Sequence, residues 1–302
     1  MKNRIKAHII VPPIKCQGIK TKIVPLILSN AVISINGRWI EPFMGSGVVG
    51  FNSGCERILF NDLNPHIIAF YNALNTSAIS SAIVREYLEQ EGNKLRERGE
   101  AHFYDIRDRF NNLKQPLDFL FLSRAGFNGM IRFNSKGLHN VPFCRKNNRF
   151  TKSYITKIVN QVERVHKLMR NSQWSFQCRD FTETIAEATE NDFVYCDPPY
   201  FGRHVDYYNT WKEEDDIKLF NSINATPAKA ILSTWHNNKY RKNPNIEKLW
   251  SKFHLITQEH FYHVGAKEIN RNPMTEALVL NYKPQVPGID RKCKMQLELD
   301  LA

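Results

Sequence analysis

The most chemically specific pattern in the sequence is the run Asp197, Pro198, Pro199 and Tyr200. It follows the apolar run 193–196, which predicts a strand, and open α/β sheets bind ligands where their strands end. Two prolines lack backbone N–H groups, so this loop presents carbonyl oxygens. Asp197 and the Pro198 carbonyl suit an amino group with two hydrogens, and the Tyr200 ring suits a planar heterocycle. A purely structural turn would need none of these properties.

A second pattern comes earlier, where Glu41 ends another expected strand and Phe43, Gly45 and Gly47 form a Phe-x-Gly-x-Gly loop. The glycines let a ligand approach the backbone closely. Asp62 ends the next expected strand, where a carboxylate accepts the two hydroxyls of a ribose. The sequence has no Gly-x-x-x-x-Gly-Lys-Ser/Thr phosphate loop. A nucleoside without phosphates therefore fits better than a dinucleotide or ATP.

Most of the positive charge lies in one segment. The 302-residue chain has a formal net charge of +12, and residues 124–170 hold eleven Lys or Arg against one acid, Glu163. Aromatic and amide side chains are interleaved with these charges, and such groups stack on bases or read their edges. A solvated basic face would also explain the run. We favour a contact surface for nucleic acid.

The composition, 42% hydrophobic and 24% charged, is that of an ordinary globular protein. No apolar run approaches the roughly 18 residues of a membrane span, and no secretory signal is evident. The six cysteines form no C-x-x-C pair, so we expect neither disulfides nor a zinc site, and a reducing cytoplasm fits best. His260 and His263, three apart in an expected strand, would point to opposite faces, so we expect no metal.

Strand and helix signals alternate on both sides of the basic segment. Strands are expected at 38–43, 57–61, 174–178, 192–196, 228–234 and 276–282. Asn64 followed by Pro65 marks a helix start. Further helices are expected at 48–52, 79–113, 151–170 and 213–223, and 124–150 is expected to be loop-rich. This order predicts an α/β sheet with an inserted, mainly helical domain.

The two motifs and the insertion between them resemble the Dam-type, D12-class N6-adenine DNA methyltransferases of the α group. The likeness spans nearly the whole chain. It includes Lys15-x-x-Gly18-x-Lys20 near the N-terminus, Asn61 and Asp62, the run 127–134, and the run 178–181. Cys16 and Ile19 depart from the pattern, because the family usually has Trp and Gly there.

The resemblance implies a Rossmann-like, S-adenosylmethionine (AdoMet)-dependent methyltransferase fold with an inserted target-recognition domain. It divides the chain into a discontinuous catalytic domain (1–75 and 174–284), a target-recognition domain (76–173) and a C-terminal tail (285–302).

For the cofactor, the resemblance implies that Lys20 pairs with the methionine carboxylate, that Asp62 binds the ribose, and that Asp180 and Phe181 flank the adenine. The methionine end is shaped by Glu41, Phe43, Gly45 and Gly47, with Asp197 beside it. Asp197, Pro198 and Tyr200 are the expected catalytic residues, acting on an adenine flipped out of the duplex. Several residues after this motif either close over the flipped base or simply pack, and the sequence leaves both open: His204, Asp206, Tyr207, Tyr208 and Trp211.

The expected DNA contacts lie in the N-terminal element and the basic segment. They are Lys15, Arg124, Phe127, Asn128, Met130, Arg132, Asn134, Asn140, Pro142 and Arg145. By resemblance Phe127 fills the gap left by the flipped base, and Asn128 and Arg132 grip flanking phosphates or bases. Met130 and Pro142 are apolar partners for a thymine methyl.

Four other functions compete with this one. An N4-cytosine DNA methyltransferase shares the fold, but by resemblance it has Ser in place of Asp197. RNA and protein-glutamine methyltransferases more often have Asn there. A non-enzymatic DNA-binding regulator would explain the basic segment but neither motif.

The resemblance also implies the setting in which the protein works. It predicts duplex DNA as partner, a GAT-containing palindrome such as GATATC as the site, and a monomer. It predicts a cytoplasmic enzyme of bacterial or phage origin, either an orphan or acting beside a cognate restriction endonuclease without a stable complex.

Overall fold

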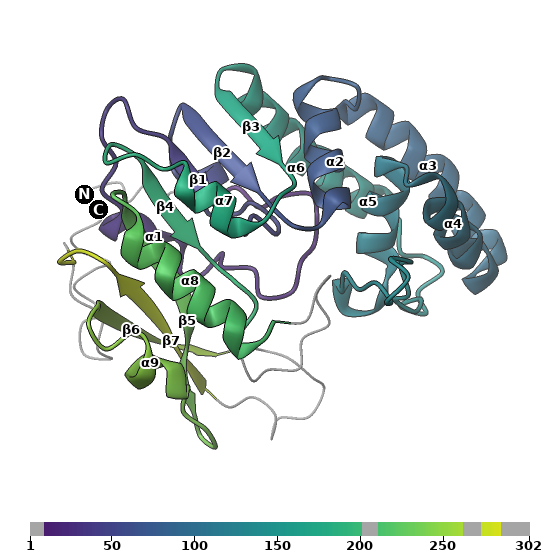
Figure 1. The fold of residues 1–302 in the computed structure, drawn as a ribbon. Helices are drawn as coiled ribbons and strands as arrows, with labels where there is room; N and C mark the ends of the chain where they lie inside the picture. Colours follow the sequence, from purple (N-terminus) through teal and green to yellow (C-terminus); the bar gives the residue numbers. More distant parts are fainter. Residues whose placement is uncertain (1–8, 201–210, 262–272, 285–302) are drawn as a thin grey trace, which may run out of the picture.

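The computed structural model describes residues 9–200, 211–261 and 273–284 (Figure 1). Within them, seven strands form one sheet in the order β3-β2-β1-β4-β5-β7-β6. Five run parallel: β1 (Trp39–Glu41), β2 (Arg57–Asn61), β3 (Gln173–Gln177), β4 (Phe193–Cys196) and β5 (Lys229–Asn238). The antiparallel β7 (Pro273–Leu280) lies between β5 and β6 (His254–Phe261). The strand order reverses between β1 and β4, which is where open α/β sheets form their ligand crevice.

Alternating side chains of the central strands build a core on each face of the sheet. Trp39, Phe193 and Tyr195 point into one hydrophobic cluster, and Ile40 and Val194 point into the other. The second cluster is covered by α7 (Phe181–Ala186), α8 (Glu213–Ala225) and α9 (Pro244–Lys248). The first is covered by α1 (Val24–Asn30) and α2 (Pro65–Asn75).

The helices of the insertion gather beside the sheet, at the right of Figure 1. They are α3 (Ser81–Arg98), α4 (Glu100–Leu113), α5 (Pro116–Ala125) and α6 (Lys152–Arg170). Their apolar residues belong to the same cluster as α1 and α2, so the insertion and that face of the sheet share one core. The apolar face of α6 is buried, as its spacing predicts, and Thr151 caps the helix by accepting a hydrogen bond from Tyr154 N.

The expected strands are confirmed to within a few residues, and the start of α2 at Pro65 is confirmed too. The expected helix at 48–52 is wrong in extent, because only the 3-10 turn η1 (Gly50–Asn52) forms. The expected helix at 79–113 is two helices that meet at Gly99, whose φ of 59° interrupts the first. The helices α1, α5, α7 and α9 carry too little apolar periodicity to be recognised. The tail, 285–302, and His263 lie outside the described residues.

Among the described helices, none combines the length and the apolar character that a membrane crossing requires.

Candidate functional site

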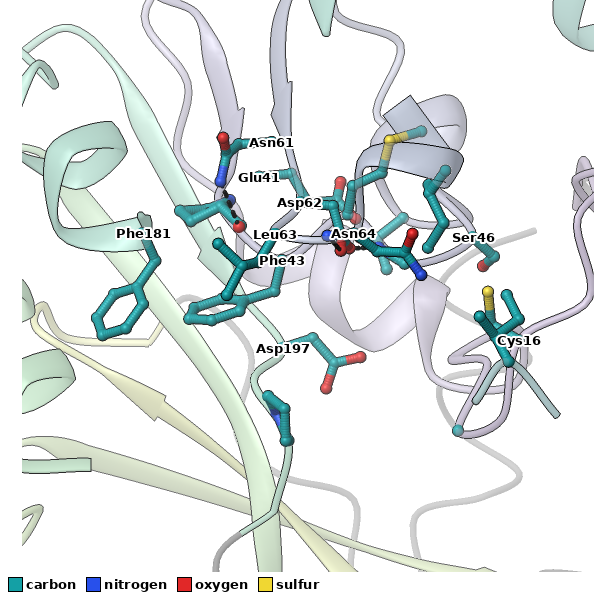
Figure 2. A pocket seen from close by; sticks show the side chains of 18 of the residues that line it. Cys16, Glu41, Phe43, Ser46, Asn61, Asp62, Leu63, Asn64, Phe181 and Asp197 are labelled. Carbon is teal, nitrogen blue, oxygen red and sulfur yellow. Dashed lines mark hydrogen bonds between the residues drawn. The ribbon is translucent and has the colours of Figure 1, made fainter. Parts of the chain in front are cut away.

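Residues of both motifs meet in one pocket at the carboxyl ends of β1, β2 and β4 (Figure 2). From the catalytic motif Asp197 and Pro199 line it, whereas Pro198 and Tyr200, also expected there, do not. The N-terminal segment and the start of α7 add to its lining, together with Ile131 and Trp211. Eight of the nine residues expected to bind the cofactor line it: Lys20, Glu41, Phe43, Gly45, Asp62, Asp180, Phe181 and Asp197. Gly47 does not line it; its φ of 77° turns the loop, and an added Cβ would lie 2.7 Å from the Phe51 ring.

Asp62 fixes the glycine loop and still faces the pocket. Its Oδ2 accepts a hydrogen bond from Gly45 N at 2.7 Å, and its Oδ1 accepts one from Asn64 N at 2.8 Å. Each carboxylate oxygen has a second lone pair, so hydroxyl groups of a ligand can still bind. Gly45 has φ +50°, and a Cβ added there would meet no atom within 4 Å. The loop backbone is therefore open to a ligand.

Glu41 is buried, and only 2% of its surface is exposed. Its Oε2 accepts a hydrogen bond from Trp39 Nε1 at 3.0 Å. Burial raises the pKa of the Glu41 carboxyl to about 8, although the bonds from Trp39 and from the Gly50 backbone oppose the rise. A Cβ on Gly50 would lie 2.5 Å from the same oxygen, so this close packing requires glycine. A cation in the pocket would favour the ionised form of Glu41.

Aromatic rings form one end of the pocket. The ring centroids of Phe43 and Phe181 lie 5.1 Å apart, and Figure 2 shows these two side chains next to each other. Trp211 lies 5.6 Å from each and donates a hydrogen bond from Nε1 to Asp216 Oδ1 at 2.6 Å. In this structure the Trp211 ring packs at the pocket, whereas residues 204 and 206–208, for which the sequence leaves the same alternative open, lie outside the described residues. Phe43, expected at the methionine end, lies against Phe181, the residue expected at the adenine, so which part of the cofactor Phe43 contacts stays a prediction.

Asp180 lies at the N-terminus of α7, where its Oδ1 accepts a hydrogen bond from Thr182 N at 2.9 Å. This cap fixes the start of the short helix that carries Phe181 into the pocket.

Lys20 lies beside the catalytic motif. Its Nζ is 2.9 Å from Asp197 Oδ1, 3.1 Å from the Gly18 carbonyl oxygen and 4.9 Å from the centroid of the Tyr200 ring. Only 5% of Lys20 is exposed. An ion-pair partner of Lys20 in this structure is Asp197, and the pairing of Lys20 with a methionine carboxylate stays a prediction. The ammonium and the carboxylate neutralise each other in a buried place.

The pKa of Asp197 is raised to about 6, because burial disfavours the charged carboxylate. The ammonium of Lys20 opposes this rise, whereas the carboxyl of Glu276 on β7 adds to it. Asp197 thus remains largely ionised at neutral pH through its contact with Lys20.

The basic segment begins with a tight turn at the pocket. Phe127 opens the 3-10 turn η2 (Phe127–Gly129) and is 48% exposed, and Asn128 next to it has φ 53°. Gly129 has φ +66°, and a Cβ there would lie 2.2 Å from Cδ of Lys15, so the lysine stem lies directly on the turn. Ile131 lines the pocket. The turn therefore lies next to residues of the pocket lining, and the Phe127 ring on it is exposed.

A small hairpin follows, closed by pairing of Phe133 with His139. Asn134 Oδ1 accepts hydrogen bonds from Lys136 N and Leu138 N, both at 3.0 Å, so this side chain shapes the turn. Next to the hairpin, Arg132 Nε donates to Asn140 Oδ1 at 2.8 Å. Two residues expected to read DNA therefore hold each other in place. Pro142 and Arg145 are exposed, and Met130 is half-buried.

The expectation that Arg124 contacts DNA is wrong, because its side chain is buried. Its side chain is 6% exposed, with Nε bonded to the Pro13 carbonyl at 2.7 Å and Nη2 bonded to Gln161 Oε1 at 2.6 Å. The guanidinium therefore ties the N-terminal segment to α5 and α6 and does not face a ligand. A count of charges along the sequence cannot distinguish this buried arginine from an exposed one.

Replacing Arg124 with leucine is expected to lower the free energy of unfolding by about 2–4 kcal/mol, because two buried carbonyl groups lose their donor. The control is Arg145→Gln, which we expect to leave stability within about 0.5 kcal/mol and to weaken DNA binding. Denaturant unfolding and DNA titration measure both. A fully stable Arg124→Leu protein that binds DNA poorly would restore Arg124 as a DNA contact.

The strand order, the antiparallel β7 and a pocket at the switch point define a Rossmann-like α/β protein with a ligand site at the switch point of its sheet. A family model of the D12 class N6 adenine-specific DNA methyltransferases matches residues 17–264. The chain belongs to this family.

The chain is also similar to several proteins that are named as methyltransferases or methylases. The Type II methyltransferase M1.LlaDCHI of Lactococcus lactis subsp. cremoris is 26% identical over 297 residues, which cover 93% of this chain and 98% of that protein. The DNA adenine methylase of Vibrio cholerae is 35% identical over 169 residues, 53% of this chain and 55% of that protein. The Retron Ec67 DNA adenine methylase of Escherichia coli is 30% identical over 210 residues, 67% of this chain and 68% of that protein. Among solved structures, an rRNA methyltransferase from Streptomyces viridochromogenes has 14% identity and a TM-score of 0.35, covering 86% of this chain and 82% of that chain.

Proposed function

We propose that this protein transfers a methyl group from AdoMet to N6 of an adenine flipped out of duplex DNA. The observation that carries the proposal is the position of Asp197. It lies at the end of β4, in the same pocket as the glycine loop and the aromatic end. A carboxylate beside a loop of two prolines presents acceptors to an amino group, and family membership supplies the adenine.

The residues present fit AdoMet. The rings of Phe43 and Phe181 would hold its adenine, and Asp62 would accept the ribose hydroxyls. Glu41 would face the cationic end, where a positive charge favours its ionised form. The pocket is lined by carboxylates and by a glycine backbone that is open to a ligand. Carboxylates attract a cationic centre and repel phosphates, so the pocket suits a cationic ligand without phosphates.

Asp197 and the Pro198 carbonyl would accept the two N6 hydrogens. The N6 lone pair of adenine is delocalised into the ring, and these hydrogen bonds localise it as the new bond forms. AdoMet supplies the electrophilic methyl group. The bond from Lys20 to Asp197 Oδ1 leaves lone pairs on both carboxylate oxygens, so the carboxylate can hold Lys20 and the substrate together. Tyr200 would stack on the flipped base.

The DNA would lie against the turn and hairpin of the basic segment. Phe127, exposed on the turn that follows α5, would fill the gap left by the flipped base. Asn128, Lys15 and the Arg132–Asn140 pair would contact the bases or phosphates around it. A GAT-containing palindrome such as GATATC, action beside a restriction endonuclease, and a monomeric state remain part of this proposal.

Purified protein incubated with AdoMet labelled on its methyl group and with duplex DNA tests the function. After digestion to nucleosides we expect the label in N6-methyladenine. Label in N4-methylcytosine would favour the cytosine enzyme, and binding without transfer would favour a non-enzymatic regulator. Either of these results would overturn the proposal.

A further inference from the structure

The far end of β5 forms a basic hairpin on the catalytic domain. We propose that this hairpin, residues 238–242, holds the DNA backbone on the side of the pocket opposite to the target-recognition insertion. The inference rests on the proposed function, because it concerns how the same duplex is held.

Strand register places the hairpin beside the active site. Cys196 of β4 pairs with Leu232 of β5, so Asp197 is level with Ser233. β5 continues to Asn238, five residues beyond that level, with an irregularity between Trp235 and Asn237. At the rise of an extended strand this is at most about 16 Å. A duplex whose flipped base enters the pocket must lie in front of this edge of the sheet. An element that extends so far past the edge then lies alongside the duplex.

Side-chain hydrogen bonds hold the hairpin in one shape. Asn238 Oδ1 accepts from Tyr240 N and from Arg241 N, both at 2.9 Å, and Asn237 pairs with Lys242. The base of the hairpin is fixed by the buried Asn243, whose Nδ2 donates to the Trp235 carbonyl at 2.9 Å. A fixed turn can present its charges in a constant position, which a free loop cannot.

The hairpin carries three positive charges in four residues. Lys239, Arg241 and Lys242 are exposed, and Tyr240 between them is 70% exposed. From 217 to 246 the sequence has no acid, so nothing along this stretch offsets the charge. Cations with an exposed aromatic ring suit phosphates and bases at the edge of a duplex. Outside the insertion the chain is close to neutral, so this local concentration is not a general property of the catalytic domain.

The position of the hairpin complements that of the insertion. The insertion packs on α2, which contacts β3, whereas the hairpin extends from β5. The pocket lies between these places, at β1 and β4. In Figure 1 the insertion lies to the right and the end of β5 points to the bottom. Two basic surfaces on either side of the pocket would hold the DNA on both sides of the flipped base.

The test compares two triple variants with the same change of charge. The first is Lys239→Gln, Arg241→Gln and Lys242→Gln, which leaves Asn238 and Asn243 in place. The control is Lys218→Gln, Lys229→Gln and Lys248→Gln, three exposed lysines on α8, at the start of β5 and on α9. The Kd for a target duplex is measured between 50 and 200 mM salt, together with AdoMet affinity and thermal unfolding.

For the hairpin variant we expect a Kd about tenfold or more weaker at 100 mM salt. The salt slope should be smaller by roughly 2–3, at about 0.9 for each phosphate that the variant no longer neutralises. AdoMet affinity should stay within about twofold, and the control should keep most of the wild-type slope. If the triple variant folds poorly, the double variant Lys239→Gln and Lys242→Gln should reduce the slope by roughly two units.

Equal slopes for the hairpin variant and the control would overturn the inference. Failure of the proposed function has a different signature, because the wild-type protein would then transfer no label to DNA. A wild type that methylates DNA together with a hairpin variant that binds like the control would sink this inference alone.

Discussion

An Asp197→Ala protein is expected to lose methyl transfer by roughly 10³-fold while it still binds AdoMet. The carboxylate is one of two acceptors proposed to hold the N6 hydrogens in the transition state, and loss of one preorganised hydrogen bond typically costs about 10²–10³ in kcat. The loss of charge beside Lys20 adds to this effect, because the buried ammonium then lacks its 2.9 Å partner.

Single-turnover transfer rates and AdoMet titration separate the two effects of Asp197→Ala. The matched control is Asp108→Ala, since Asp108 is 70% exposed on α4 and should leave both quantities unchanged. Rapid transfer by the Asp197→Ala protein would show that another group holds the amine. A loss of AdoMet binding equal to the loss of rate would show that Asp197 serves the cofactor.

Replacing Lys20 with methionine is expected to move the acid limb of the pH–kcat profile upward by at least about one pH unit. Asp197 has a pKa of about 6, raised by burial and held down by Lys20. Without the ammonium, burial acts unopposed and the pKa rises further, so more of the carboxyl is protonated at neutral pH. A protonated Asp197 accepts hydrogen bonds less well, and kcat falls at pH 7 but recovers as the pH rises.

The charged groups around Asp197 come from three elements. Lys20 approaches from the N-terminal segment, Glu276 from β7 and Glu41 from β1. The two acids raise pKa values in this cluster, so Lys20 is the cation that keeps Asp197 ionised there. The control Lys20→Arg preserves the positive charge and should keep the acid limb close to its wild-type position. A changed KM for AdoMet with an unshifted pH profile would instead place Lys20 at the methionine carboxylate.

Local patterns predicted what lies close together in the chain. The loop from Glu41 to Gly47 and the run from Asp197 to Tyr200 each follow one strand, and parallel strands bring their carboxyl ends to one edge. The contact between Lys20 and Asp197 joins residues far apart in sequence and depends on how the N-terminal segment packs. The spacing of residues along the sequence could therefore not predict this contact.

Charge counting failed for a related reason. It predicted that Arg124 contacts DNA, although this side chain is buried and bonded to carbonyl groups. It also missed the basic hairpin, because the charges of Lys239, Arg241 and Lys242 are a small part of the chain's 42 Lys and Arg residues. Only the fold shows that these three charges extend past the edge that carries Asp197. Short apolar helices such as α5 also escaped, because a helix buried on all sides has no amphipathic period.

The central claim is that this pocket methylates adenine N6 through Asp197. The most direct measurement maps modified bases in the DNA of a host without adenine methylation of its own, expressing either the wild-type chain or the Asp197→Ala variant. We predict N6-methyladenine at one GAT-containing palindrome with the wild type and none with the variant. N4-methylcytosine with the wild type, or unchanged N6-methyladenine with the variant, would contradict the claim.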